Sequence, residues 1–405
     1  MDRIIIQDSF QEVIEDVYNG VNDSDSFWVS RIVPGVETSQ EFRINVNDES
    51  NQFHGDNGVQ FNQISPDKYE LKVDQDNEYL LQTPFSRFSK NLLDITAVAL
   101  SPDGKLVAIG HSNGRLKVMD TWTEKVVLSI EQAHFADITS LKFFSSGKVI
   151  CSGSIDMQIK LWSVEKGTNP RSMVGHTSAV TQLILLGSTG RNFLSSSTDG
   201  SVRLWECGSG SNIHTFRRVV DMNDEALSMS ITKRETSTTT TTTTTNSSKE
   251  LQFETKGYYV YVGYSSGNIQ QYDVDDLSQT KVKFPSINGS SVTSLDVITL
   301  EEDLVIAGYS DGILRIWRDN KVWFELRVDG EDQEITKIHS SLCQSTNSLK
   351  VLVCHGDLIK LNINLQSGEL IGVEYLVGME QIKDIDLKSK VLMAGGHEGV
   401  IKYIN

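Results

Sequence analysis

Cysteine is scarce in this chain of 405 residues. The four cysteines form no C-x-x-C pair and do not cluster with histidine; they are Cys151, Cys207, Cys343 and Cys354. A disulfide framework or a structural zinc site requires such pairing or clustering. We therefore predict a reduced protein that holds no metal and no other cofactor.

Long apolar runs are also missing. No stretch approaches the length that spans a bilayer, and the opening residues MDRIIIQDSF are too short and too acidic for a signal peptide. We expect an intracellular protein of the cytoplasm, with the nucleus left open as a second location. The sequons at Asn22, Asn246 and Asn288 are then not expected to carry glycans.

Positive charge is in short supply. Lys and Arg number 37 against 54 Asp and Glu, for a net charge of −17. Nucleic acids and anionic membranes are polyanions, so neither is an expected partner. The balance favours a basic protein partner, with the alternative that the acidity only keeps the protein in solution.

Motifs of catalysis are missing as well. We find no glycine-rich phosphate loop, no zinc-ligand spacing and no nucleophile elbow. The stretch GHSNG at Gly110 precedes an expected strand, so it offers no helix N-terminus to a phosphate. His111, His355 and His397 fall near equivalent turns, where hydrogen-bonded turn residues are favoured over a metal site. We predict that the chain is not an enzyme.

A repeat runs through most of the chain. Stretches such as STDGSVRLWE combine a turn with an alternating apolar strand that reaches a large side chain. That last position recurs at Met119, Trp162, Trp205, Tyr272, Trp317, Asn362 and Ile404, in steps of 43, 43, 67, 45, 45 and 42 residues. A period in the low forties with four strands per unit is typical of a propeller. The expected fold is all-β, a seven-bladed β-propeller with a small N-terminal β-rich acidic domain.

The repeat also predicts the domain organisation. Residues 1–78 lie outside it, and residues 1–90 hold 17 Asp and Glu against 7 Lys and Arg. The alternation in YELKV and the expected burial of Trp28 favour a folded domain there over a disordered acidic arm. The propeller is predicted over residues 79–405. YLLQTPF, residues 79–85, is expected to complete the last blade and remove an open edge. The threonine tract in residues 232–250 is expected to be a disordered loop.

The repeats resemble the WD-repeat family. The full signature occurs twice, at His134, Ser152, Asp156 and Trp162, and at His176, Ser195, Asp199 and Trp205. The resemblance implies a buried hydrogen-bonded network, because a buried carboxylate needs donors and an indole N–H needs an acceptor. These residues, with Asp311 and Trp317, are therefore expected to be structural. The unit that ends at Tyr272 has Ser266 in the aspartate position and is expected to rely on ordinary packing.

Acidic residues gather in the loops that should share one face of the ring. We predict that this face binds a basic partner and that few bases offset it, mainly Arg217, Arg218 and Arg327. An apolar or aromatic anchor is also needed, and the sequence does not identify one. The predicted partner-binding residues are Glu131, Asp137, Asp221, Asp224, Glu225, Asp329, Glu331, Asp332, Glu334 and Glu380.

A closer resemblance covers residues 83–210. The stretches PFSRFSK, FFSSGKV and LWECG, with Gln158 two residues after Asp156, are similar to the proteasomal-ATPase-associated factor family. This family is the WD-repeat assembly chaperone of the proteasome regulatory particle. The resemblance implies a non-catalytic chaperone that binds the C-terminal domain of a proteasomal ATPase subunit through an acidic propeller face. We expect it to be a monomer when alone.

Two alternatives differ in class. The chain could be a generic WD-repeat scaffold or a ubiquitin-ligase substrate receptor, although no F-box-like helical segment precedes the ring. An enzyme that uses the central channel would need converging polar groups on the innermost strands. Those strands are mostly apolar, with scattered Thr and Ser.

Overall fold

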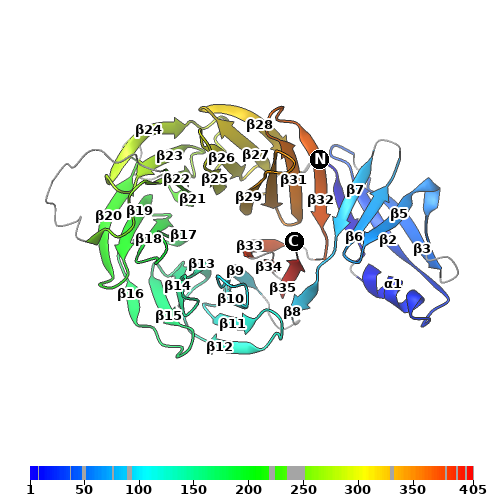
Figure 1. Cartoon of the computed structure of the whole chain (residues 1–405), viewed down its shortest axis with the longest axis horizontal. Coiled ribbons are helices and arrows are strands. Elements are labelled where there is room, and N and C mark those ends of the chain that lie inside the picture. Colours follow the sequence, from blue (N-terminus) through cyan, green and yellow to red (C-terminus); the bar gives the residue numbers. More distant parts are fainter. Residues whose placement is uncertain are drawn as a thin grey trace.

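The computed structural model describes most of the chain. The described residues are 1–7, 9–36, 38–47, 52–74, 77–88, 94–218, 224–234, 251–328, 333–378, 381–388, 391–396 and 399–404. Among them, strands arranged as antiparallel meanders form seven sheets around a central axis, and a smaller segment lies against the outside of this ring (Figure 1). We number these sheets as blades 1 to 7 in chain order.

Blades 1 to 5 each consist of four consecutive strands. Blade 1 comprises β9 (Ile95–Leu100), β10 (Leu106–His111), β11 (Leu116–Asp120) and β12 (Val126–Ile130). Blade 2 comprises β13 (Ile138–Phe143), β14 (Val149–Ser154), β15 (Ile159–Ser163) and β16 (Arg171–Met173). Blade 3 comprises β17 (Val180–Leu185), β18 (Asn192–Ser197), β19 (Ser201–Glu206) and β20 (Ser211–Arg217). Blade 4 comprises β21 (Ala226–Lys233), β22 (Tyr258–Tyr264), β23 (Ile269–Asp273) and β24 (Ser278–Phe284). Blade 5 comprises β25 (Val292–Ile298), β26 (Leu304–Tyr309), β27 (Ile313–Arg318) and β28 (Lys321–Arg327).

Blades 6 and 7 each recruit strands from the start of the chain. Blade 6 comprises β29 (Lys337–Cys343), β30 (Ser348–Cys354), β31 (Leu358–Asn364) and β32 (Leu370–Leu376), and its sheet continues into β7, β6 and β5. Blade 7 comprises β33 (Ile382–Lys388), β34 (Val391–Gly396), β35 (Gly399–Ile404) and β8 (Ser86–Phe88). The predicted all-β propeller class is confirmed.

Burial explains why the second strand of a blade has little polar–apolar alternation. In β14, β18 and β34, side chains on both sides are buried almost throughout, because neighbouring blades cover both faces of the sheet. The outermost strands β12 and β24 instead have many exposed or half-exposed side chains. The serine run of β18 is tolerated in the interior because Ser195 and Ser196 make side-chain hydrogen bonds there.

The ring closes at a position a few residues later than predicted. Residues 86–88 of β8, and not residues 79–85, pair with β35, with Ser86 opposite Lys402 and Phe88 opposite Val400. Both stretches have short apolar strand patterns, and a pattern does not specify a strand's partner. The expected closure of the last blade by an upstream strand holds, but the strand was misassigned.

A buried lysine reinforces this closure. The side chain of Lys402 is fully buried, and its Nζ lies 3.2 Å from the ring centroid of Trp122 and 4.9 Å from that of Phe85. Nζ also donates a hydrogen bond to the carbonyl of Thr121 at 3.1 Å. Burial lowers the pKa of Lys402, and Asp120 and Glu124 oppose this shift. The aromatic rings and the carbonyl thus replace the water that a buried ammonium loses.

Strand β7 (Glu78–Gln82) joins the N-terminal segment to blade 6 and corrects the predicted domain boundary at residue 78. It pairs in parallel with β32 on one side and antiparallel with β6 on the other. A single sheet therefore crosses the boundary that the repeat predicted. Residues 79–82 serve this junction, whereas the backbone N–H of Phe85 donates to the carbonyl of Lys402 in blade 7 at 2.7 Å.

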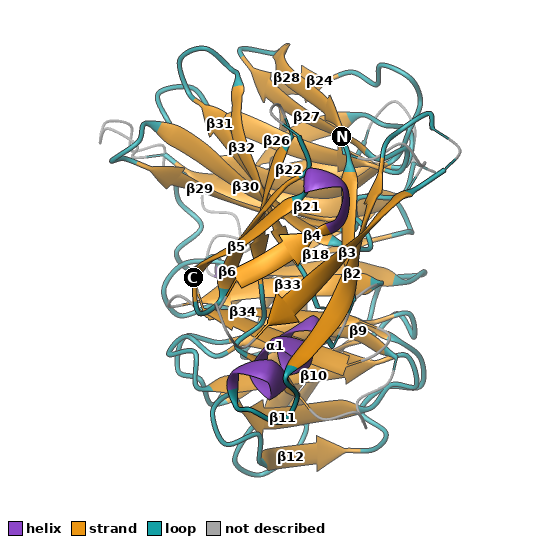
Figure 2. Ribbon diagram, turned by 90° about the vertical axis from the view of Figure 1, so that its right-hand side faces the viewer, coloured by secondary structure: helices purple, strands orange, loops and turns teal. Residues whose placement is uncertain are grey.

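The segment before β7 is folded, with a helix that the sequence analysis missed. Its elements are β1 (Arg3–Ile6), α1 (Phe10–Tyr18), β2 (Ser24–Ile32), β3 (Gln40–Asn47), β4 (Gln52–Gly55), a 3₁₀ turn (Asp56–Gly58), β5 (Gln60–Ser65) and β6 (Lys68–Lys72). Figure 2 looks onto this segment, with α1 lying alongside its strands. Phe10, Phe27, Phe61 and Tyr69 form its aromatic core. Trp28 was predicted to be buried but is exposed, because Phe27 occupies the inward position of β2.

Polar contacts fasten this segment to blade 6. Asp2 accepts hydrogen bonds from Arg31 at 2.6 Å and from the hydroxyl of Tyr79, and its carbonyl accepts one from Tyr375 at 2.6 Å. Glu374 of β32 pairs with Lys68 of β6 at 2.6 Å. Apolar residues from both sides also belong to one continuous core. The N-terminal segment is thus packed against the propeller and shares its core.

The threonine-rich insertion starts later than predicted. Thr232 and Lys233 belong to β21 and pair with Tyr259 and Tyr258 of β22, so the predicted loop of residues 232–250 does not begin at Thr232. Residues 235–250 lie outside the described part of the chain. In the described ranges, no helix is long and apolar enough to cross a membrane.

The contacts of Lys402 with the rings of Trp122 and Phe85, which we call the lysine clamp, lead to a stability prediction. Trp122→Ala should lower the free energy of unfolding by about 2 kcal/mol, because a buried ammonium loses a close aromatic face. Chemical denaturation monitored by circular dichroism measures this change. Trp122→Phe, which keeps an aromatic ring, should lose less. Equal stability of Trp122→Ala and the parent protein would show that the clamp contributes nothing.

Candidate partner-binding face

Blade 2 contains the hydrogen-bonded network expected of its four signature residues. His134 Nε2 lies 2.6 Å from Ser152 Oγ, and Trp162 Nε1 donates to the same oxygen at 2.9 Å. His134 Nδ1 lies 3.0 Å from Asp156 Oδ2. Asp156 lies in the turn between β14 and β15, so the network links the interior of the blade to one face of the ring.

Blade 3 repeats this geometry. His176 lies 2.6 Å from Ser195 Oγ and 2.9 Å from Asp199 Oδ2, and Trp205 Nε1 donates to Ser195 Oγ at 2.8 Å. Both rings are buried. Asp199 and Trp205 are therefore engaged inside the blade and are not available to a substrate.

Burial determines the protonation of the two histidines. It lowers the pKa of both His134 and His176, and this outweighs the opposite effect of Asp156 and Asp199. Each imidazole is therefore neutral at pH 7. The bonding pattern assigns the proton to Nδ1, which donates to the aspartate, while Nε2 accepts the serine hydroxyl.

The two aspartates also anchor the loops of this face. Burial alone would raise the pKa of Asp199, but hydrogen bonds from His176, Ser201 and the N–H of Thr177 outweigh it, so the pKa falls. In blade 2, the N–H of Phe135 donates to Asp156 at 3.0 Å. Each carboxylate thus fixes the loop that enters its blade to the turn between the second and third strands.

Blade 4 replaces the signature with a different polar network, which corrects two predictions. Asp224 was predicted to contact a partner, but it is only 4 % exposed. It accepts hydrogen bonds from Ser266 Oγ at 2.6 Å and Ser265 Oγ at 3.0 Å, and it pairs with Arg218. Blade 4 was also expected to rely on packing alone. The acid on the incoming loop instead compensates for the serine in the aspartate position.

Blade 5 has part of the signature. Asp311 accepts hydrogen bonds from Ser290 Oγ at 2.8 Å and from the side chain of Asn288, so it also anchors a loop. Trp317 is buried in the core between blades 4 and 5. Ala307 stands at the register of Ser152 and Ser195, so Trp317 has no serine acceptor of the kind seen in blades 2 and 3.

The remaining predicted contact residues divide into two groups. Glu131, Glu225 and Glu334 are exposed, and Asp137 is half-buried. Their loops lie at the same end of the sheets, since each connects the outermost strand of one blade to the innermost strand of the next. The other predicted contacts, Asp221, Asp329, Glu331, Asp332 and Glu380, lie outside the described residues.

Bases that the sequence analysis did not count lie near this face. Arg115 pairs with Glu131 at 2.7 Å, and Lys160 Nζ donates to the carbonyl of Ala133 at 2.8 Å. Arg203 and Arg315 occupy the position of Lys160 in the third strands of blades 3 and 5. The recurrence of a base shortly after the turn is visible in the repeat alignment and could have been found there. These bases reduce the net charge of the face.

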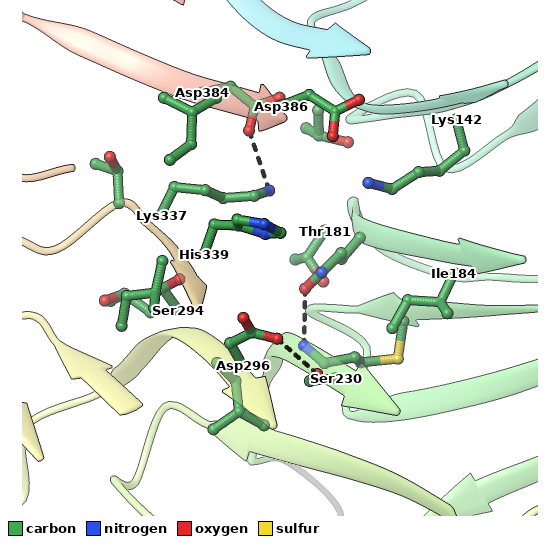
Figure 3. Close-up of a pocket in the computed structure, with 18 of the residues that line it drawn as sticks. Lys142, Thr181, Ile184, Ser230, Ser294, Asp296, Lys337, His339, Asp384 and Asp386 are labelled. Atoms are coloured by element: carbon green, nitrogen blue, oxygen red, sulfur yellow. Dashed lines mark hydrogen bonds and ion pairs between the residues drawn. The ribbon is translucent and has the colours of Figure 1, made fainter. Parts of the chain in front are cut away.

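The central channel is more polar than its sequence suggested. A cavity of about 550 Å³ lies on the axis and is lined by residues of the innermost strands. Figure 3 shows Lys142, Lys337, His339, Asp296, Asp384 and Asp386 around it. The expectation that these strands carry only scattered Thr and Ser among apolar residues is wrong.

Most of these channel groups join one blade to the next. Asp384 accepts the N–H of Val98 at 2.9 Å, and Asp296 accepts the N–H of Ser340 at 2.7 Å. A hydroxyl near the start of the innermost strand donates to a carbonyl of the following blade in five successive cases, from Thr96, Thr139, Thr181, Ser228 and Thr293. The polar lining therefore has a structural use, and among the described residues no His, Cys, Asp and Glu group of three or more could hold a metal.

Comparisons with known proteins agree with this architecture. The family model "WD domain, G-beta repeat" matches residues 83–120, 125–163 and 167–206. Two solved structures share the fold at low sequence identity. U3-55K has a TM-score of 0.62 and 16 % identity, covering 79 % of this chain and 98 % of its own. The RRP9 WD40 repeats have a TM-score of 0.61 and 17 % identity, covering 86 % of this chain and 100 % of their own.

The ring and its buried networks define a WD-repeat β-propeller, a class of protein that binds other proteins. One relative identifies a particular family within this class. The chain is 35 % identical over 315 residues to the 26S proteasome regulatory subunit RPN14 of Saccharomyces cerevisiae. The aligned region covers 77 % of this chain and 73 % of that protein. The chain belongs to the family of this subunit. It is a non-enzymatic WD-repeat protein that is related to a proteasome regulatory subunit.

The buried network of blade 3 predicts a loss of stability on truncation. Asp199→Ala should reduce the free energy of unfolding by about 1–3 kcal/mol, because the donors of His176, Ser201 and Thr177 lose their acceptor. Urea denaturation measures the difference. Asp199→Asn keeps one acceptor oxygen and should lose less. An alanine variant as stable as the parent would contradict the structural role of Asp199.

The buried histidines predict a pH dependence of stability. Histidine in the unfolded chain gains a proton below its ordinary pKa of about 6.5, whereas burial lowers the pKa of His134 and His176, so they gain a proton only at lower pH in the folded state. Below this pH the unfolded state binds more protons than the folded state. The free energy of unfolding therefore decreases as the pH is lowered, by up to about 1.4 kcal/mol per pH unit for each histidine.

Urea denaturation between pH 7.5 and 5.5 tests this dependence. His176→Gln should reduce the slope of stability against pH, although it also lowers stability itself. His54→Gln, which changes an exposed histidine of β4, is the control and should keep the parent slope. An unchanged slope in His176→Gln would show that this ring does not remain neutral in the folded protein.

Proposed function

We propose that the protein is an assembly chaperone of the proteasome regulatory particle. It binds the C-terminal domain of one proteasomal ATPase subunit through the acidic loop face. The relation to a 26S proteasome regulatory subunit supports the proteasomal context. By binding the ATPase module, the chaperone would keep it from engaging the core particle early. This role requires a location in the cytoplasm, with the nucleus as a second site.

The observation that carries this proposal is the exposure of loop acids at one end of a rigid ring. Both backbone polar groups of Glu225 form hydrogen bonds that hold its loop in place. Its N–H donates to Ser265 Oγ at 3.1 Å, and its carbonyl accepts the N–H of Ser265 at 3.0 Å. Glu334 is exposed on the equivalent loop between blades 5 and 6. Acids held on a preorganised scaffold attract a basic partner without an ordering cost on binding.

The arrangement favours a partner that covers several loops at once. A single exposed ion pair contributes only about 0.2–1 kcal/mol, so useful affinity requires several acids. The loops are separated around the ring and cannot all contact one short peptide. A folded basic domain that spans several blades fits this geometry better than a linear motif.

Charge reversal tests the proposed face. Glu225→Lys combined with Glu334→Lys should weaken binding of the ATPase C-terminal domain at least about fivefold at low salt, through lost attraction and new repulsion. The measurement is a titration of the full chain against each of the six separately expressed domains, at low and high salt. High salt should reduce the difference between variant and parent protein.

The matched control places the same charge change on the opposite end of the ring. Glu165→Lys with Glu369→Lys alters exposed acids in turns between third and fourth strands. This variant should bind like the parent. Equal weakening by both pairs of substitutions would indicate a general charge effect instead of a specific face. Absence of binding to all six domains at either salt concentration would refute the proposed chaperone function and leave a generic scaffold or a ubiquitin-ligase receptor.

A further inference from the structure

Four exposed apolar side chains gather at one end of blade 2, on the same face as the loop acids. Phe135, Ile155, Met157 and Val174 are 75, 44, 45 and 72 % exposed. Hydrogen bonds hold together the segments that carry these side chains. The N–H of Phe135 donates to Asp156, and the N–H of Ile155 donates to the carbonyl of Asp137 at 3.0 Å. Val174 follows Met173, which pairs with Ile159 just after the turn. We call these four residues the blade 2 patch.

The equivalent positions of blade 3 are not apolar. The strand registers of the two blades align the patch with Thr177, Thr198, Gly200 and Arg217. Both blades contain the same His–Ser–Trp–Asp network, so the fold does not require apolar residues at these places. The patch is therefore a property of blade 2 and not of the repeat.

Met157 adds a second, independent observation. Its φ is +67°, in the left-handed region that disfavours residues with a side chain. At the same turn, blades 1, 3, 4 and 5 have Gly114, Gly200, Gly267 and Gly312, with φ between +72° and +82°. A methionine here strains the backbone and exposes an apolar side chain. Neither effect helps folding or solubility, so the residue points to a contact outside the chain.

Charges around the patch indicate what kind of partner it fits. Glu131, Asp137 and Asp156 lie in the same loop and turn, against Arg115 and Lys160. Both bases are already engaged. Arg115 pairs with Glu131, and Lys160 Nζ bonds to the carbonyl of Ala133 while lying 5.6 Å from the Phe135 ring centroid. Arg203 of blade 3 also approaches Gly175 next to Val174, so three bases offset the three acids nearest the patch. The cations of a partner are instead complemented by the exposed acids of neighbouring loops on the same face, Glu225 and Glu334.

We propose that the blade 2 patch is the apolar anchor of the acidic face. It takes an apolar side chain flanked by Lys or Arg on the C-terminal domain of the ATPase. This inference rests on the proposed function and names the part of the face that contributes most to affinity. Interfaces owe most of their affinity to a few buried apolar or aromatic residues, with charges around them that steer and orient the partner.

Blade 3 supplies the substitutions that test the proposal. Phe135→Thr and Met157→Gly each place the blade 3 residue in blade 2, where the same network supports it. Phe135→Thr should weaken binding to the ATPase domain about tenfold. Met157→Gly should weaken binding severalfold while its melting temperature stays equal to the parent's or rises, because the backbone strain is relieved. A purely structural role cannot produce weaker binding together with unchanged or higher stability.

The control variant is Ile371→Ala, which removes an exposed apolar side chain on β32, away from the patch. It should bind like the parent. Affinities are measured at high salt as well as low, because an apolar contact persists where charge attraction is screened. Parent-like affinity of both Phe135→Thr and Met157→Gly would overturn this inference while leaving the proposed function intact. Failure of the parent protein to bind any of the six ATPase domains would overturn both.

Discussion

The pairing of β8 with β35 is the interaction on which the rest of the molecule depends. It turns an open row of sheets into a closed ring and removes the free edge of blade 7. Only three residue pairs form this joint, so side chains must support it. Lys402 does so between two aromatic rings. The channel is enclosed on all sides only when blade 7 lies beside blade 1, where Asp384 accepts the N–H of Val98.

A closed ring makes the loop face rigid, and the buried networks transmit that rigidity to individual loops. In blades 2 and 3 an aspartate links the incoming loop to the neighbouring turn, and in blade 4 Asp224 does the same from the loop itself. The carboxylates that support the face are therefore distinct from those that can meet a partner. Two adjacent acidic residues of one loop can have these different uses, as the buried Asp224 and the exposed Glu225 do.

The spacing of large third-strand residues was enough to predict the propeller, because each blade repeats the same burial at its third strand. Spacing could not decide which upstream strand closes the ring, since residues 79–85 and 86–88 both fit a short strand and only tertiary contacts distinguish them. Trp28 was misplaced because a shift of one residue reverses the face of a strand. Asp224 was misread because an acid in a polar loop looks the same whether or not Arg218 and two serines surround it. The apolar patch escaped notice because its members are dispersed between residues 135 and 174.

The location of β7 and β8 in the chain has a consequence for biosynthesis. β7 pairs with β32, and β8 pairs with β35, so both strands are made before blades 1 to 5, and their partners are made after these blades. While the ribosome adds the intervening residues, these early strands have no native neighbour on that side. Blades 1 to 5 can assemble in order as they emerge, whereas blades 6 and 7 can be completed only after β32 and β35 have left the exit tunnel. The segment that contains β1 to β7 is thus translated before the ring, but its pairing with blade 6 forms only after most of the ring has been made.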